Sequence, residues 1–179
     1  MISIWSEEDM SCSFYIFGLP DSWLCWTALN VELRGKEVSD LCSTRLKLRA
    51  DEKVYVGARV LPMGWKSAVG VLQYFHRRLC LLPPPRGAGL KPGDELRKDR
   101  PMPSSSSGSK DSERGFWSVY VDNFTQVELT YLDETSGRKG ATEEQKNLRA
   151  AYDYWGVPRA EDKAVERQVG SMRLRSRNL

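Results

Sequence analysis

The sequence predicts one α+β domain whose chain is interrupted by a long segment that contributes little to the core. Three observations lead to this prediction: runs suited to strands, two segments with helical spacing, and a Pro-, Gly- and Ser-rich stretch between them. The chain has 179 residues, 40% of them hydrophobic and 28% charged, which is typical of an ordinary globular protein. The core is therefore expected from residues 1–82 and 116–170, with a disordered insertion over 83–115 and a basic tail over 171–179.

The first half of the core predicts strands followed by a helix. Ile2–Ser6 is predicted as a strand, and after a bend the run Leu24–Leu33 is predicted as another, because both suit a pleated surface. Val54–Leu61 is the third predicted strand. Apolar residues then recur at helical spacing over 67–82, and Ser67 is placed to cap the helix.

The second half predicts a hairpin, a helix and a final strand. In the run that begins at Phe116, Val119 and Val121 alternate with Tyr120 and Asp122, and this run can pair with Thr125–Leu132 across a turn at 122–124. Thr142 and Gln145 have the spacing of a capping box for a helix that ends at Gly156. The remaining segment, 163–169, is predicted as a short strand.

Bulk properties exclude several classes of protein. The N-terminus lacks the basic start and apolar run of a secretory signal. The most apolar stretch, 14–26, is broken by Pro20 and is too short to span a bilayer. We therefore expect a soluble intracellular protein of the cytoplasm or nucleus, without membrane contact. Four separated cysteines and one histidine argue against a zinc site or a disulfide framework. A net charge of +3 is too small to indicate nucleic-acid binding by itself.

Two acidic residues occupy positions of interest. Asp9 is placed at the end of a strand, and Asp122 lies at the tip of the predicted hairpin. A turn or capping carboxylate is the simplest interpretation of each residue alone. The motifs around them, and the order of those motifs, favour a second interpretation.

Several motifs together resemble the palm domain of retroelement reverse transcriptases, which are RNA-directed DNA polymerases. Asp9-Met-Ser-Cys-Ser-Phe14-Tyr15 is similar to the first palm motif, an aspartate followed five positions later by an aromatic residue. The stretch 61–73, Leu-Pro-Met-Gly-Trp-Lys-Ser-Ala-Val-Gly-Val-Leu-Gln, resembles the family's Leu-Pro-Gln-Gly-Trp-Lys segment and the helix after it. Tyr120-Val-Asp-Asn123 resembles the Tyr-x-Asp-Asp hairpin.

The motifs continue in the family's order toward the C-terminus. Trp155-Gly156, followed by Pro158 and Lys163, is similar to the fourth palm motif, and Val169-Gly170 to the fifth. The resemblance covers most of 9–170 outside the insertion. It implies a palm-like antiparallel sheet packed on two main helices.

The resemblance also implies an activity and a metal site. Nucleotidyl transfer in this family uses two metal ions about 4 Å apart, which activate the attacking oxygen and stabilise the leaving diphosphate. Asp9 and Asp122 match the carboxylates that hold Mg²⁺ or Mn²⁺, which prefer oxygen ligands. Lys163 matches a lysine that faces the departing diphosphate. The implied partners are an RNA or DNA template-primer and deoxynucleoside triphosphates.

Six further residues match substrate-binding positions of the family. Phe14 matches the residue beneath the sugar that excludes a 2′-hydroxyl, although a core aromatic is an equal interpretation. The others are placed near the incoming nucleotide, the template or their phosphates: Met63, Gly64, Trp65, Lys66 and Tyr120. Helix capping by Gly64 and Trp65, and an exposed surface position for Lys66 or Lys163, are the alternatives.

The sequence also departs from the family pattern. Asn123 replaces the second hairpin aspartate, and Met63 replaces a glutamine, leaving a thioether that is a weak acceptor. Fingers and a thumb are not found in the sequence, so we expect a truncated fragment with weak or no activity. A non-catalytic nucleic-acid-binding module and a scaffold that kept only the palm's packing are the alternative hypotheses.

Overall fold

The computed structural model describes residues 2–42, 47–103, 115–130 and 139–170. The chain forms two compact units, and each is described by itself. Unit 1 comprises Met1–Ser13 and Val69–Leu179, and unit 2 comprises Phe14–Ala68. The predicted tail, 171–179, and the later part of the predicted insertion, 104–114, lie outside the described residues.

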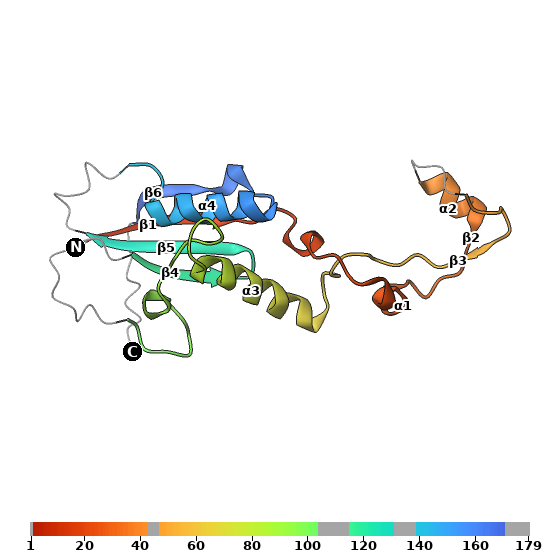
Figure 1. Ribbon diagram of the computed structural model, residues 1–179, viewed down its shortest axis with the longest axis horizontal. Helices are drawn as coiled ribbons and strands as arrows, with labels where there is room; N and C mark the ends of the chain where they lie inside the picture. Colours follow the sequence, from red (N-terminus) through yellow and green to blue (C-terminus); the bar gives the residue numbers. More distant parts are fainter. Residues whose placement is uncertain (1, 43–46, 104–114, 131–138, 171–179) are drawn as a thin grey trace, which may run out of the picture. The chain divides into compact units, whose positions relative to one another are not determined.

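Unit 1 contains a four-stranded sheet in the order β4-β5-β1-β6, with antiparallel pairing throughout (Figure 1). Its strands are β1 (Ile2–Asp9), β4 (Gly115–Tyr120), β5 (Asn123–Thr130) and β6 (Val165–Gly170). The predicted first strand, hairpin and final strand are therefore confirmed, and β1 extends further than expected, to Asp9. With its helices, the described chain is α+β, as the sequence predicts.

Side chains of β1 alternate between the two faces of the sheet, as the pleat requires. Ile4, Ser6 and Glu8 are buried on one face, whereas Trp5 on the other is 42% exposed. The neighbouring strand β5 buries residues of similarly mixed polarity: Phe124, Gln126, Glu128 and Thr130. The buried face of the sheet is therefore unusually polar, and its polar groups need partners from the helices.

Helix α4 (Glu143–Trp155) begins and ends as its sequence predicts. The side chain of Thr142 accepts a hydrogen bond from the backbone N–H of Gln145, and Gly156 ends the helix in the left-handed conformation at φ 66°. The capping box is only half formed, because the Gln145 side chain binds β1 and β6 instead of returning to Thr142. Helix α4 therefore lies on the buried face of the sheet (Figure 1).

Helix α3 (Lys66–Leu81) matches the predicted helix with a small shift. It begins at Lys66, so Ser67 lies inside the first turn and the predicted N-cap is wrong by one or two positions. Leu72, His76 and Leu79 are buried at helical spacing, while Val71, one of the apolar residues in the predicted helix, is 43% exposed. The core stripe therefore includes the chain's one histidine.

The predicted insertion is partly an ordered element of unit 1, which corrects the expectation for 83–103. Gly87, Ala88 and Glu95 are buried, and a 3-10 turn, η3, spans Pro92–Asp94. Arg77 of α3 makes two hydrogen bonds of 2.7 and 2.8 Å to the Glu95 carboxylate. Disorder was predicted because the segment has few apolar residues. An ion pair and backbone hydrogen bonds order it instead, by attaching it to α3 and β4.

Unit 2 holds short elements in place of the two strands predicted there. They are η1 (Ser13–Ile16, whose first residue belongs to unit 1), η2 (Asp21–Trp23), α1 (Leu24–Thr27), β2 (Leu33–Arg34), α2 (Gly35–Leu41) and β3 (Lys53–Val54). The prediction of strands over 24–33 and 54–61 is therefore wrong, except that Leu33 and Val54 belong to the short strands β2 and β3. Trp26, Leu29 and Tyr55 are more than half exposed, so these apolar residues do not mark the buried strands that their composition predicts.

Two further features concern the whole described chain. All four cysteines are free thiols; Cys12, Cys25 and Cys42 are exposed, and Cys80 is buried. None of the helices in the described ranges combines the length and apolar character needed to span a bilayer.

Candidate active site at the β1 end of the sheet

The end of β1 and the β4–β5 turn meet at one end of the sheet. Asp9 is the last residue of β1 and lies opposite Asn123, the first residue of β5. The backbone N–H of Met10 donates to the backbone carbonyl of Asp122 over 3.1 Å. The structure therefore brings Asp9 and Asp122 together, although they are far apart in the sequence.

The Asp9 carboxylate is largely enclosed and has a lysine as partner. Its side chain is 10% exposed, and its Oδ2 accepts a hydrogen bond from Lys163 Nζ over 2.8 Å. The hydrogen bond to Asp9, together with the charges of Asp9, Asp162 and Asp122, raises the pKa of Lys163 above its usual value. The Lys163 ammonium therefore lies in the field of these carboxylates, although its side chain is 63% exposed.

Residues 158–163, here called the strap, hold Lys163 beside β1. Ser11 N–H donates to Pro158 O over 2.8 Å, and Ala160 N–H donates to Asp9 O over 2.9 Å. The strap ends in a 3-10 turn, η5 (Glu161–Lys163), that leads into β6. Backbone hydrogen bonds thus fix the base of the Lys163 side chain independently of its ion pair.

Asp122 lies in the turn and has a hydroxyl partner. Ser13 Oγ donates to Asp122 Oδ2 over 3.3 Å, and Ser13 is itself buried. Tyr120 lies opposite Asn123 on the other side of the turn and is 76% exposed. Tyr120 is therefore available for contact with a ligand, and Asn123 lies between it and Asp9 in the register of the sheet.

The turn contains a β-branched residue in an unfavourable conformation. Val121 has φ 58°, in the left-handed region that a valine rarely adopts. Helix α3 holds this conformation through Gln73, whose Nε2 donates to Val119 O over 2.8 Å and whose Oε1 accepts from Val121 N over 2.6 Å. Because these bonds fix the backbone on the residue before Asp122, α3 sets the position of that carboxylate.

His76 is a second support of the turn from α3. Its Nδ1 lies 3.0 Å from Val121 O, and its Nε2 lies 2.6 Å from Tyr152 Oη. A carbonyl can only accept, so Nδ1 carries the proton and Nε2 accepts from the Tyr152 hydroxyl. Burial lowers the pKa of His76 to about 4, so the neutral form persists at physiological pH.

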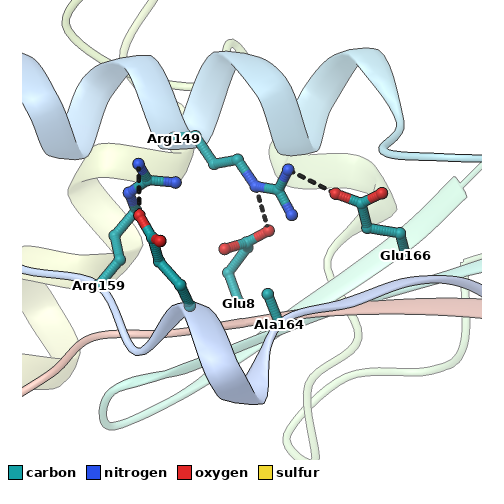
Figure 2. Close-up of a pocket in the computed structure, with 6 residues that line it drawn as sticks. Glu8, Arg149, Arg159, Ala164 and Glu166 are labelled. Atoms are coloured by element: carbon teal, nitrogen blue, oxygen red, sulfur yellow. Dashed lines mark hydrogen bonds and ion pairs between the residues drawn. The ribbon is translucent and has the colours of Figure 1, made fainter.

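On the opposite face of β1, the Glu8 carboxylate belongs to an ion network. Glu8 is 2% exposed, and its Oε1 accepts from Arg149 Nε over 2.6 Å. Figure 2 shows Arg149 extending from α4 between Glu8 and Glu166, to which it donates over 2.6 Å. Burial raises the pKa of Glu8, whereas the bond from Arg149 opposes that rise.

A pocket of about 360 Å³ lies beside this network. Its lining combines arginines with carboxylates: Glu8, Arg149, Arg159, Glu161, Ala164 and Glu166 (Figure 2). Arg149 and Arg159 both pair with carboxylates of the lining itself. Both arginines are therefore paired within the lining, which holds three glutamates against two arginines, and we assign this side of the sheet a structural role.

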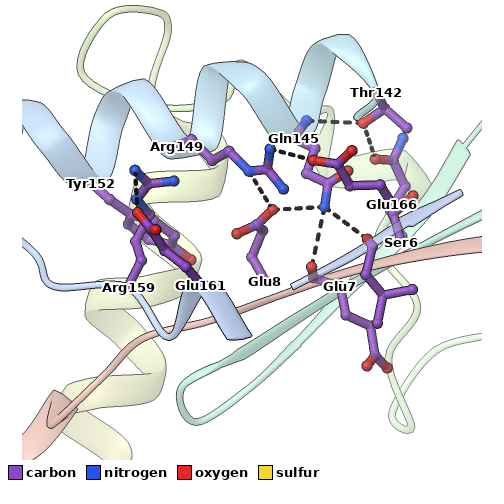
Figure 3. Close-up of polar contacts among 12 residues, drawn as sticks. Ser6, Glu7, Glu8, Thr142, Gln145, Arg149, Tyr152, Arg159, Glu161 and Glu166 are labelled. Carbon is purple, nitrogen blue, oxygen red and sulfur yellow. Dashed lines mark hydrogen bonds and ion pairs between the residues drawn. The ribbon is translucent and has the colours of Figure 1, made fainter. Parts of the chain in front are cut away.

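Gln145 joins the same network from α4 (Figure 3). Its Nε2 lies within hydrogen-bond distance of Glu7 O, Glu8 Oε1 and Val165 O, at 3.1, 2.7 and 2.9 Å. Three acceptors around one nitrogen settle the orientation of the amide. The Gln145 side chain therefore fixes two neighbouring strands, β1 and β6, to the helix.

The donor set for a metal consists of the two carboxylates. Within the described ranges, no cluster of three or more His, Cys, Asp or Glu side chains could hold a metal ion. Mg²⁺ in nucleotide sites commonly takes one or two carboxylates and completes its coordination with water and substrate phosphates. Asp9 and Asp122 fit that smaller requirement, while Lys163 occupies one oxygen of Asp9.

The other five predicted site residues, Phe14, Met63, Gly64, Trp65 and Lys66, belong to unit 2. Phe14 is half-buried in the 3-10 turn η1, so both interpretations given for it stay open. Gly64 has φ 99°, in the left-handed region that favours glycine, just before α3. Met63 and Lys66 are exposed, and Trp65 is half-buried with its ring centre 6.2 Å from that of Trp23.

Several residues of the site have no role assigned from sequence. Gln73 is part of the quoted 61–73 motif, but its pairing with the turn backbone depends on packing that spacing does not show. Ser13 and Tyr152 carry no distinctive pattern. His76 offers a signal, since a single histidine on the apolar stripe of a helix has to find polar partners when it is buried.

No protein-family model matches this chain, and no curated protein matches it. The geometry of the described residues therefore carries the functional argument.

Proposed function

We propose that unit 1 is a nucleotidyltransferase core of the reverse-transcriptase palm type, with weak or no activity by itself. The observation that carries the proposal is the meeting of Asp9 and Asp122 at the end of the sheet, beside the Lys163 ammonium. These are the residues that the motif resemblance assigns to the metals and to the diphosphate. The antiparallel sheet packed on α3 and α4 also supports it.

Each residue has a definite task in this proposal. Asp9 and Asp122 would hold divalent cations through their carboxylates; bound Mg²⁺ or Mn²⁺ would activate the attacking 3′-oxygen and stabilise the departing diphosphate. Lys163 would neutralise charge on that diphosphate, since its exposed side chain can reach beyond Asp9. Tyr120, exposed beside the turn, would contact the primer or the nucleotide.

The resemblance also implies a substrate for this core. A deoxynucleoside triphosphate and a template-primer of RNA or DNA are the proposed substrates. Asn123 lowers the negative charge next to the metals relative to the family pattern, so metal affinity should be modest.

Two measurements test the proposal. Titration with Mn²⁺ should broaden the NMR signals of Met10 and Asn123 selectively, and primer extension with a homopolymer template should be slow or absent. Asp9→Asn should abolish the broadening and any extension, whereas Glu7→Gln, the same chemical change two residues earlier on β1, should leave both intact. Broadening that survives Asp9→Asn, or no broadening at millimolar Mn²⁺, would contradict the proposal.

Non-catalytic nucleic-acid binding is the second candidate function. It is favoured by the Asn123 replacement and by exposed basic residues of unit 1, including Arg78, Arg86 and Lys98. Such binding should weaken steeply with added salt and survive Asp122→Ala. A filter-binding series at two salt concentrations distinguishes it from a metal-dependent site.

A further inference from the structure

Lys163 lies where a cation would approach Asp9. Its Nζ is 2.8 Å from Asp9 Oδ2, and a divalent ion that coordinated this oxygen would lie about 2.1 Å from it. The two positions are too close to be filled together, because an ammonium and a metal on one oxygen would repel each other strongly. Coordination of a metal through Oδ2 of Asp9 therefore requires the Lys163 ammonium to leave.

The structure allows that movement without disturbing the sheet. The backbone of the strap is bonded to Ser11 through Pro158 and to Asp9 of β1 through Ala160, so the base of Lys163 stays in place. Its side chain is 63% exposed, and its hydrogen bond to Asp9 is made through one flexible ammonium. Rotation of the side chain into solvent breaks one ion pair and leaves the backbone bonds intact.

The charges around Asp9 explain why a counter-ion is needed when no metal is bound. Asp9 is 10% exposed, and Asp122, which is half-buried, lies in the adjoining turn, so two carboxylates lie at one end of the sheet. His76, whose charge would interact with Asp9, is neutral at physiological pH and supplies no positive charge. Lys163 alone among these neighbours balances them.

We propose that Lys163 is a tethered counter-ion of Asp9, which occupies the carboxylate in the metal-free protein and is displaced when a divalent cation binds. The proposal rests on the function proposed above and concerns the regulation of the same site. Lys163 thereby lowers metal affinity in the absence of substrate. A bound triphosphate offers the displaced ammonium a new anionic partner, so metal and nucleotide should bind cooperatively.

The experiment compares Mn²⁺ affinities of the full chain and its variants by the broadening of the Met10 and Asn123 signals. Lys163→Met should bind Mn²⁺ about three- to tenfold more tightly than the original chain, because no ammonium competes for Asp9. Lys163→Arg keeps the positive charge and should stay close to the original affinity.

A matched control comes from unit 2. Lys53 matches Lys163 in ion-pair distance and in exposure, with its Nζ 2.9 Å from Glu32 Oε2 and its side chain 65% exposed, although its partner Glu32 is the more exposed carboxylate, at 33%. Lys53→Met removes the same charge from the chain and should leave Mn²⁺ affinity unchanged. Thermal unfolding of each variant would test whether the fold is retained.

The outcomes separate this inference from the proposed function. If Lys163→Met binds Mn²⁺ more tightly and Asp9→Asn abolishes that binding, both the counter-ion role and the proposed function are supported. Equal or weaker binding by Lys163→Met, with Asp9-dependent binding in the original chain, overturns the counter-ion role and leaves the metal site standing. Absence of Asp9-dependent binding in every variant overturns both.

Discussion

Glu8 and Asp9 are neighbours on β1, but their carboxylates are held in different ways. Glu8 faces α4, is 2% exposed and has Arg149 and Gln145 of that helix as partners. Asp9 is paired on the opposite face with Lys163, whose side chain is 63% exposed. The Glu8 carboxylate is thus fixed by the fold, whereas the partner of the Asp9 carboxylate can be exchanged. Asp9 is therefore the carboxylate suited to binding a ligand.

The largest expected effect is on the Glu8 side. Arg149→Met leaves the buried Glu8 carboxylate without its cation and should lower the free energy of unfolding by about 3 kcal/mol at pH 7. Urea unfolding followed by far-UV circular dichroism measures the change. Lys146→Met, on the same helix, removes an exposed lysine paired with Glu143 and should cost less than about 1 kcal/mol.

The double variant sharpens this result. Adding Glu8→Gln to Arg149→Met removes the unpaired charge and should restore part of the lost stability. A loss below about 1 kcal/mol for Arg149→Met alone would show that the helix side is no more firmly held than the open side.

The next largest effect is the pH dependence of stability caused by His76, the residue of α3 that supports the β4–β5 turn. Burial lowers the pKa of His76 from 6.5 to about 4, so between these values the unfolded chain binds a proton that the folded chain does not. Stability is therefore complete above pH 6.5 and decreases as the pH falls toward 4. The free energy of unfolding should drop by about 2 kcal/mol between pH 7 and pH 5 from this residue.

His76→Gln isolates that contribution, because glutamine can donate to Val121 O and accept from Tyr152 without titrating. The raised pKa of Glu8 works in the opposite direction, since a folded state that binds the proton more tightly loses stability as the pH rises above 4.5. Both proteins share Glu8, so their difference reports His76. A parallel pH dependence in the two proteins would mean that His76 is not buried in its neutral form.

The smallest expected effect is on the Asp9 side. Asp9→Asn removes one member of an ion pair whose lysine is mostly exposed, and should change the free energy of unfolding by less than about 1 kcal/mol. Urea unfolding at pH 7 gives the value, with Glu7→Gln as the control. A loss above about 2 kcal/mol would place Asp9 among the structural carboxylates and remove the contrast with Glu8.

Local signals predicted the fold best where local interactions form it. The Thr142 cap and the Gly156 stop gave α4 nearly to the residue, and the alternation after Phe116 gave the β4–β5 hairpin. The strands expected at Leu24–Leu33 and Val54–Leu61 failed because composition reports suitability for a sheet and cannot show whether a partner strand is present.

For the candidate site, the order of the motifs predicted which acidic residues form it, but not which side chains fix their positions. Asp9, Asp122 and Lys163 come together as a set. The supports from Gln73 and His76 depend on the packing of α3 against the turn, and no spacing in the sequence encodes that contact. The roles of the five site residues in unit 2 stay predictions.

The position of β1 inside the sheet has a consequence for folding. Ser6 pairs with Gln126 and Ile4 with Val169, so this strand can join only after long chain loops have closed on both of its sides. The hairpin and α4 depend on contacts close in sequence and can form first, whereas insertion of β1 should be the slow step. Until it occurs, β5 and β6 each have an unpaired edge, and a folding intermediate of this kind can pair with other chains and aggregate.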